Sequence, residues 1–281
     1  MKLSDAIKER ALKSGTIIQS TQEADIMKIF NKLFYLPRNI EEETKFIKQV
    51  MTRGTDNEKR VGLHASAIIV GDKEFCPREQ VLSLLYEQLQ GENVPIGLKR
   101  IFEEGNAIHE KWQRLFIRGG LGKAEDMDFS RFNKKYEISF TPDAIIEIDG
   151  VKYVVEIKSV NTYQFKGMTE HPSGAKQLKF YMWLTGIHQG IVLLDDKNTQ
   201  EFKLKVYTFD EKAKSVVVKF IDRLKLVQKA KKRLLEKGKL IKRHEECISY
   251  TAKRCTKCNM RDVCFGKKKV RLDVQDDCDW C

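Results

Sequence analysis

The chain has 281 residues, of which 41% are hydrophobic and 33% charged, and its formal net charge is +12. This length suits one large domain or two modest ones, and the composition predicts a folded core. The absence of an apolar run of about 18 residues excludes a membrane-spanning helix, and the first residues lack the apolar segment of a secretory signal. We therefore expect a cytoplasmic protein without a membrane partner.

Lysine and arginine are concentrated between residues 203 and 243, where they make up 15 of 41 residues. A basic segment of this kind favours polyanionic partners, because each contact with a phosphate releases a bound counterion. Basic charge also provides solubility, and most of these side chains are expected on the solvated face of a helix. The charge distribution favours nucleic acid as the partner.

Residues 1–60 predict a helical extension without a chemical signature. One helix stops at Pro37, and a second begins with Asn39 as its cap and ends at Gly54. We expect this extension to pack against the rest of the protein or to bind a protein partner.

Two further helices are predicted before the first strand. One begins directly after Cys76 with Pro77 at its first position, and the other covers residues 97–119. His109 lies beside the apolar stripe of the second helix, where a packed histidine is more common than a metal ligand. The stripe is expected to consist of Ile101, Ile108, Trp112, Leu115 and Phe116.

The segment 141–158 carries the most informative pattern in the chain. Two apolar, β-branched runs flank Asp149 and Gly150, which is a strong signal for a two-residue hairpin turn. With these two residues as the turn, Ile148 faces Val151. One face of the hairpin is then core material: Ala144, Ile146, Ile148, Val151, Tyr153, Val155 and Ile157.

The same register places Asp143 directly opposite Glu156, with Cβ atoms roughly 5 Å apart. Lys158 lies two residues beyond Glu156 and projects to the same face. Opposed carboxylates repel each other, so a divalent cation or Lys158 should offset them. Metal-assisted phosphodiester hydrolysis requires such carboxylates, and the carbonyl of Ile157 can complete the metal shell. A surface ion cluster of small energetic worth is the alternative for these residues.

A helix capped by Ser173 is expected to follow the hairpin and to run to Gly186. Gln177 and Tyr181 are four residues apart on it and share a face, where they either pack or support a DNA phosphate and the metal ligands. Strands are expected over 191–196 and 201–209, so that strand, helix and strand form a right-handed βαβ crossover. A long basic helix is expected over 211–237.

Six of the seven cysteines lie within the last 35 residues. The spacing Cys255-x2-Cys258-x5-Cys264 predicts a shared metal centre in a cytosolic chain. Both zinc and an iron–sulfur cluster take four ligands, and the fourth is either the nearby Cys247 or the distant Cys76. The terminal Cys278 and Cys281 are expected to be free or locally paired thiols, with a metal site as the alternative.

These motifs follow one another in a particular order along residues 64–266. They are Cys76-Pro77-Arg78, the G-x-x-x-H pattern from Gly105 to His109, Asp143 with Glu156 and Lys158, the Q-x-x-x-Y pattern from Gln177 to Tyr181, and Cys255, Cys258 and Cys264. In this order they resemble the RecB-like branch of the PD-(D/E)XK nuclease superfamily. The similarity is greatest to its CRISPR-associated and phage-type iron–sulfur exonucleases and to the nuclease domain of AddB.

The resemblance implies an α/β fold with a central mixed sheet flanked by helices, as in restriction endonucleases. It implies a nuclease core over residues 61–245, preceded by the extension 1–60 and followed by a cysteine-rich region 246–281. The implied activity is that of a Mg²⁺- or Mn²⁺-dependent DNase acting on single strands or DNA ends. A non-catalytic DNA-binding module and an RNA-directed nuclease are the alternatives, and polarity, exo or endo action, oligomeric state and pathway stay open.

The resemblance also assigns residues to roles. The implied metal ligands are His109, Asp143, Glu156 and the carbonyl of Ile157, with Lys158 assisting the attacking water and Gln177 and Tyr181 supporting the DNA. A structural [4Fe–4S] cluster would be held by Cys76, Cys255, Cys258 and Cys264, and would join the two ends of the core. Cys247 keeps the identity of the fourth cluster ligand open.

Overall fold

The computed structural model describes residues 15–52, 62–85 and 96–267. The described residues form two compact units. The first is drawn from the ranges 1–59, 97–133 and 140–217, and the second from 60–96, 134–139 and 218–281. These units alternate along the chain, whereas the sequence suggests three consecutive domains. The division into residues 1–60, 61–245 and 246–281 stays a prediction, because a compact unit need not be a domain that folds by itself.

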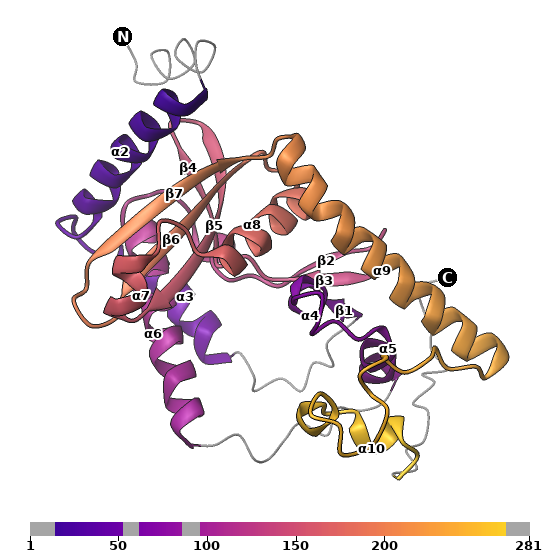
Figure 1. The fold of residues 1–281 in the computed structure, drawn as a ribbon. Coiled ribbons are helices and arrows are strands. Elements are labelled where there is room, and N and C mark those ends of the chain that lie inside the picture. The colour runs from indigo at the N-terminus through magenta and orange to yellow at the C-terminus, as the bar shows by residue number, and fades with distance from the viewer. Residues whose placement is uncertain (1–14, 53–61, 86–95, 268–281) are drawn as a thin grey trace. The chain divides into compact units, whose positions relative to one another are not determined.

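The first unit is built on a four-stranded sheet in the order β4-β5-β6-β7 (Figure 1). Its strands are β4 (Ala144–Ile148), β5 (Val151–Val160), β6 (Gln189–Asp196) and β7 (Phe202–Thr208). The central pair β5 and β6 is parallel, and the two outer pairs are antiparallel. A parallel pair requires a crossover, and α7 (Thr162–Gly167) and α8 (Pro172–Thr185) supply it.

Helices cover both faces of this sheet (Figure 1). On one face, α2 (Gly15–Leu33) and α6 (Ile96–Arg118) contribute Phe30, Trp112 and Phe116 to an apolar cluster with the sheet residues Ile146 and Leu193. On the other face α8 packs closely on β6: a Cβ at Gly190 would lie 2.7 Å from Met182 Sδ. The expected central mixed sheet flanked by helices is therefore confirmed, and it is consistent with a restriction-endonuclease-like core.

The remaining elements of the first unit are short or peripheral. They are α3 (Ile40–Thr52), the 3₁₀ turn η1 (Ala124–Asp126) and the strand β2 (Arg131–Asn133). The helices α2 and α3 confirm the helical character expected near the N-terminus, and the backbone N–H of Glu42 donates to Asn39 Oδ1, as expected of a cap.

The second unit contains β1 (Leu63–His64), α4 (Ala65–Ile69), α5 (Pro77–Leu85), most of β3 (Ile138–Phe140), η2 (Cys255–Lys257) and α10 (Arg261–Cys264). Strands β1 and β3 pair in parallel. The long helix α9 (Glu211–Lys237) begins in the first unit and continues into the second. Within the second unit, the guanidinium of Arg223 donates to the carbonyls of Ile68 and Val70, which secures the loop after α4.

The hairpin between β4 and β5 has the predicted turn and register. Asp149 and Gly150 both have positive φ, 51° and 77°, the conformation of a type I′ turn. Ile148 pairs with Val151, and pairing continues to Ala144 opposite Val155. The core face is also confirmed, because its members belong to the apolar cluster or pack against it.

Two details of the helices differ from the sequence prediction. Helix α8 begins at Pro172 and not after Ser173, because His171 is the cap and its Nδ1 accepts the backbone N–H of Gly174. Ile101 is 56% exposed, so it does not belong to the buried stripe. That stripe begins at Ile108, because the first turns of α6 lie beyond the apolar cluster.

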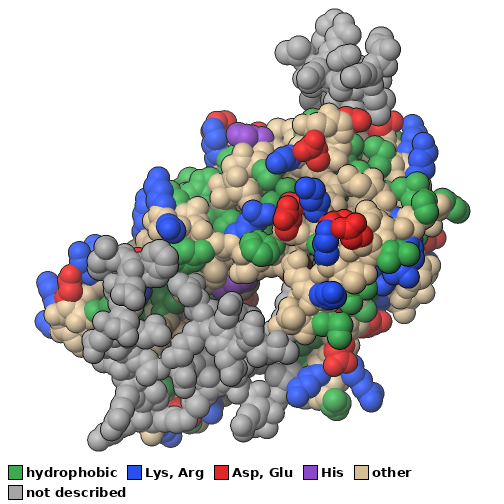
Figure 2. Space-filling model, turned by 180° about the vertical axis from the view of Figure 1, so that it is seen from behind, with side chains coloured by type: hydrophobic (Ala, Val, Ile, Leu, Met, Phe, Trp, Pro, Cys, Tyr) green, Lys and Arg blue, Asp and Glu red, His purple; other side chains and the backbone are tan. Residues whose placement is uncertain are grey.

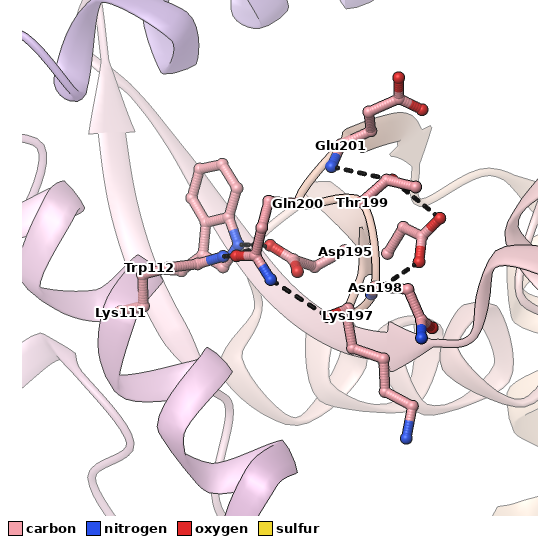
Figure 3. A network of polar contacts seen from close by, with 9 residues as sticks. Lys111, Trp112, Asp195, Lys197, Asn198, Thr199, Gln200 and Glu201 are labelled. Atoms are coloured by element: carbon pink, nitrogen blue, oxygen red, sulfur yellow. Dashed lines mark hydrogen bonds and ion pairs between the residues drawn. The ribbon is translucent and has the colours of Figure 1, made fainter.

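A buried carboxylate joins α6 to the end of β6 (Figure 3). Asp195 is fully buried, and one of its oxygens, Oδ2, accepts hydrogen bonds from Lys111 Nζ at 2.8 Å and Trp112 Nε1 at 2.7 Å. Lys111 also contacts Gln200 Oε1 in the β6–β7 turn. These bonds fix the segment of α6 that carries His109, two residues before Lys111.

Candidate active site

The structure brings His109, Asp143, Glu156, Lys158 and Gln177 together in the first unit. Glu156 and Lys158 project from β5, Asp143 stands immediately before β4, His109 comes from α6 and Gln177 from α8. Four segments of the chain thus meet at the open end of the β4–β5 hairpin. The strand register predicts that Asp143, Glu156 and Lys158 share a site. His109 and Gln177 lie there because α6 and α8 pack beside the hairpin.

Asp143 is held by several neighbours. Its Oδ1 lies 3.2 Å from His109 Nδ1, and its Oδ2 accepts the backbone N–H of Ile157 at 2.6 Å. Its carbonyl oxygen accepts a hydrogen bond from the buried amide of Gln113. Burial alone would raise the pKa of Asp143, but His109, Lys158 and the Ile157 N–H outweigh it and lower the pKa. Asp143 is therefore an anion with fixed orientation.

Glu156 is 1% exposed and poorly paired. Its Oε1 lies 2.5 Å from Lys158 Nζ, but the contact lacks the geometry of a hydrogen bond, and among the described residues Oε2 has no hydrogen-bond partner. Burial, followed by the charge of Asp143, raises the pKa of Glu156 to about 8. The carboxyl of Glu156 therefore resists ionisation in this buried position beside Asp143.

A chain of hydrogen bonds leads from Lys158 into α8. Lys158 Nζ donates to Gln177 Oε1 at 3.2 Å, and Gln177 Nε2 donates to the hydroxyl of Tyr181 at 3.1 Å. Burial lowers the pKa of Lys158, but Glu156 and Asp143 outweigh burial and raise it. The ammonium therefore stays charged, and Gln177 fixes its direction.

His109 is the histidine that the resemblance assigns to the metal. Burial lowers its pKa, but Asp143 and then Glu156 outweigh burial, so the pKa is raised. The imidazole consequently shares its proton with Asp143 in the ion pair. Its side chain is 29% exposed, which distinguishes it from the fully packed histidine that the pattern of α6 alone would favour.

The carboxylates of Asp143 and Glu156 suit a hard divalent cation. Among the described residues, however, no three His, Cys, Asp or Glu side chains are arranged closely enough to form a metal-binding group. Here Asp143 contacts His109, and Glu156 contacts Lys158. Burial and Asp143 together outweigh these cations in the pKa of Glu156, and its Oε2 has no hydrogen-bond partner among the described residues. Carboxylate oxygens are the ligands that Mg²⁺ and Mn²⁺ prefer.

The five described cysteines line one pocket of the second unit: Cys76, Cys247, Cys255, Cys258 and Cys264. Each carries a free thiol. The guanidinium of Arg78 donates to Cys264 Sγ at 3.1 Å and to its carbonyl at 3.2 Å. As described, these five thiols are not arranged closely enough to form a metal-binding group. Both candidates for the fourth cluster ligand border the same space, and Cys278 and Cys281 lie outside the described residues.

The thiols of this pocket influence one another. Burial, followed by a hydrogen bond with Cys255, raises the pKa of Cys247 to about 11. Burial and Glu79 raise the pKa of Cys258 to about 12. Protonated thiols are poor ligands, so binding of a metal or cluster here must be coupled to the loss of thiol protons.

Two residues near the carboxylates were missed in the sequence. The side-chain amide of Gln113 donates to the carbonyl oxygen of Asp143. A polar residue within the apolar stripe of α6 was the sequence signal for this contact. His171 belongs to none of the sequence motifs, but it caps α8 beside Lys158. The proline that follows it was the available signal, since proline is favoured in the first helical turn.

Basic side chains do not gather in a single patch on the face drawn in Figure 2, where Lys and Arg alternate with Asp and Glu. Several basic residues of α9 are exposed, as expected for a solvated helix face. Each described helix is too short or too polar to cross a membrane.

No protein-family model and no curated protein matches this chain. Among solved structures, SSO0001 aligns over 81% of this chain and 95% of its own, at 16% identity and a TM-score of 0.42. LHK-Exo in complex with dAMP aligns over 63% and 93%, at 15% identity and a TM-score of 0.46. A second structure of LHK-Exo, an alkaline exonuclease from Laribacter hongkongensis, gives a TM-score of 0.43. Similarity at this level assigns no activity to this chain.

Proposed function

We propose that this protein is a Mg²⁺- or Mn²⁺-dependent deoxyribonuclease of the RecB-like PD-(D/E)XK type. The observation that carries the proposal is the convergence of His109, Asp143, Glu156 and Lys158 in one largely buried cluster. A purely structural ion cluster would pair its charges, whereas Glu156 keeps an unsatisfied oxygen and a raised pKa. Such unfavourable burial of charge is typical of functional sites.

His109, Asp143, Glu156 and the carbonyl of Ile157 would hold the divalent cation. When bound, the cation activates a water and neutralises the charge that develops on the phosphate. Lys158 can then orient the water and stabilise the pentavalent transition state. Gln177 holds the lysine in that direction, and Tyr181 in turn holds Gln177.

We propose DNA as the substrate, as single strands or duplex ends, because the resemblance of the motifs points to exonucleases and the chain carries a net charge of +12. Phosphate contacts supply most of the affinity of such proteins, independently of sequence. The rival functions are a non-catalytic DNA-binding module of the same fold and an RNA-directed nuclease.

We also propose that Cys76, Cys255, Cys258 and Cys264 hold a structural [4Fe–4S] cluster. Support comes from the shared pocket, in which Cys76 directly precedes α5 and the other three lie on the segment that includes α10. Thiolates so far apart in sequence would tie the beginning of the second unit to its end. The arginines around the pocket, among them Arg78, suit the negative charge of a cluster with four thiolates.

The test of the nuclease proposal uses end-labelled single-stranded DNA, duplex DNA and RNA of equal length, each with Mg²⁺, Mn²⁺ or chelator. We expect cleavage of DNA with either metal and none with chelator. Preferential cleavage of RNA would select the RNA-directed alternative. DNA binding without cleavage under all conditions would select the non-catalytic module.

A further inference from the structure

His171 lies beside Lys158, the lysine of the proposed active site, although no motif of the chain includes it. A Cβ built on Gly174 would lie 3.3 Å from Lys158 Cε and 3.4 Å from His171 Nδ1. The two side chains therefore border the same small region at the start of α8. The charge of Lys158 acts on the imidazole, because it lowers the pKa of His171 together with burial, which is the larger cause.

The hydrogen bonds of His171 define its tautomer. Its Nδ1 accepts the backbone N–H of Gly174 at 3.1 Å and lies 3.1 Å from Ser173 Oγ. A neutral imidazole whose Nδ1 accepts a hydrogen bond carries its proton on Nε2. Nδ1 makes the contacts with the start of α8, so the Nε2–H is not used by the cap, and the side chain is half-buried. The ring therefore carries an N–H donor that capping does not require.

The residue at position 174 explains how these groups come so close. Gly174 is buried, and any larger residue would place its Cβ 3.2 Å from Lys158 Cγ. Only glycine lets the lysine stem lie against the first turn of α8 without displacing either neighbour. The lysine and the histidine are thereby held on two sides of one backbone position.

We propose that His171 is a substrate-binding residue whose Nε2–H donates to a phosphate of the nucleic acid next to the one that Lys158 faces. This inference rests on the proposed nuclease function. Lys158 and His171 border the same region at the start of α8, and their ammonium and imidazole N–H are two donors that suit neighbouring phosphates of one strand. Phosphate contacts of this kind position the strand without reading its sequence.

The competing role for His171 is that of a helix cap alone, and one pair of variants separates the two roles. His171→Asn keeps a capping side chain, because asparagine is among the best caps, but it removes the long Nε2–H donor. His171→Ala removes both the cap and the donor. His188→Asn makes the same exchange at an exposed histidine beyond the end of α8 and is the matched control.

The experiment measures kcat and KM for single-stranded DNA with Mn²⁺, together with the melting temperature of each variant. We expect KM to rise about tenfold in both His171→Asn and His171→Ala, the loss typical of one hydrogen bond to a charged group. We expect kcat and the half-saturating Mn²⁺ concentration to change less than about twofold, and a lower melting temperature only for His171→Ala. His188→Asn should match the wild type in KM.

A wild-type KM in His171→Asn would overturn the inference, whether His171→Ala is impaired or not, because capping would then be the whole role of the residue. A tenfold loss of kcat with unchanged KM would also overturn it, since the residue would then act on the reaction and not on strand binding. If the wild type neither binds nor cleaves DNA, the nuclease proposal itself fails, and this outcome is distinct from both.

Discussion

The carboxylate site of the first unit and the cysteine pocket of the second differ in how their side chains are brought together. Asp143 and Glu156 meet because two strands of one hairpin pair in a fixed register, and a backbone N–H holds Asp143 in place. The thiols come from the start of α5 and from irregular segments near α10. They share a pocket, but no β-ladder aligns them.

The two sites therefore differ in how much they must rearrange when a metal or cluster binds. The carboxylate site is organised by the fold, and a cation has only to displace the contacts with His109 and Lys158. In the cysteine pocket several thiols have raised pKa values, so binding must remove protons and draw the sulfurs together. Loss of the metal should therefore leave the first unit folded, whereas loss of a cluster should destabilise the second.

The largest expected effect is on catalysis. Asp143→Asn and Glu156→Gln should each lower DNA cleavage at least about 10³-fold, since each removes a negatively charged metal ligand. Glu147→Gln, an acid-to-amide exchange at an exposed position of the same hairpin, is the control and should keep wild-type activity. Circular dichroism should show an intact fold in all three. Near-wild-type cleavage by Asp143→Asn would remove the basis for the active-site assignment.

The next effect concerns the second unit. Cys76→Ser should lose the iron of anaerobically purified protein and lower its melting temperature by about 10 °C or more, because a closed cluster site lacks one thiolate. Cys247→Ser should retain the iron. Iron and sulfide content and the visible absorption near 400 nm provide the measurement. The opposite result would define the ligands as Cys247, Cys255, Cys258 and Cys264, and zinc without iron would refute the cluster.

A smaller effect is expected at the link between Lys158 and α8. Gln177→Leu should reduce kcat about tenfold, because Lys158 loses the acceptor that directs its ammonium. Tyr181→Phe removes only the more distant hydroxyl and should cost less. Steady-state kinetics with Mn²⁺ measure both. If Tyr181→Phe were the more damaging change, Tyr181 would act by itself and not through Gln177.

The smallest effect is a dependence of stability on pH in metal-free protein. Burial, followed by the charge of Asp143, raises the pKa of Glu156 to about 8 from its ordinary value of 4.5, so the native state binds more protons than the unfolded state between these values. Its contribution to stability is full below about pH 4.5 and is lost as the pH rises through 8. Glu156→Gln removes this dependence.

Metal-free Glu156→Gln should therefore be more stable than wild type at pH 9, by several degrees in melting temperature, and the difference should shrink towards pH 4.5. Thermal unfolding in chelator between pH 4.5 and 9 measures it. A constant difference across this range would show that the carboxyl of Glu156 titrates normally.

Local signals were sufficient for the parts of the fold that local rules determine. Asp149 and Gly150 predict the turn, and the turn determines every pairing of the hairpin, including the approach of Asp143 to Glu156. Proline, asparagine and glycine mark the ends of the helices, as Pro77 does for α5. The parallel pairing of β5 and β6 follows from a helix inserted between two apolar runs.

Other features depend on packing between distant segments. The raised pKa of Glu156 requires burial under α8, which the alternation of the strand does not reveal. Ile101 has the spacing of a core residue but lies beyond the end of the apolar cluster. His171 has no periodic pattern, and its proximity to Lys158 depends on the absence of a side chain at Gly174. Neither compact unit is a continuous piece of chain, so composition along the sequence could not outline them.

The most direct test of the account is a titration with Mn²⁺, followed by electron paramagnetic resonance of free Mn²⁺ and by calorimetry, on wild type, Asp143→Asn, Glu156→Gln and Glu147→Gln. We predict a Mn²⁺ site in the wild type and in Glu147→Gln, and binding at least tenfold weaker in the other two. Equal binding by all four proteins would contradict the claim that Asp143 and Glu156 share a divalent cation.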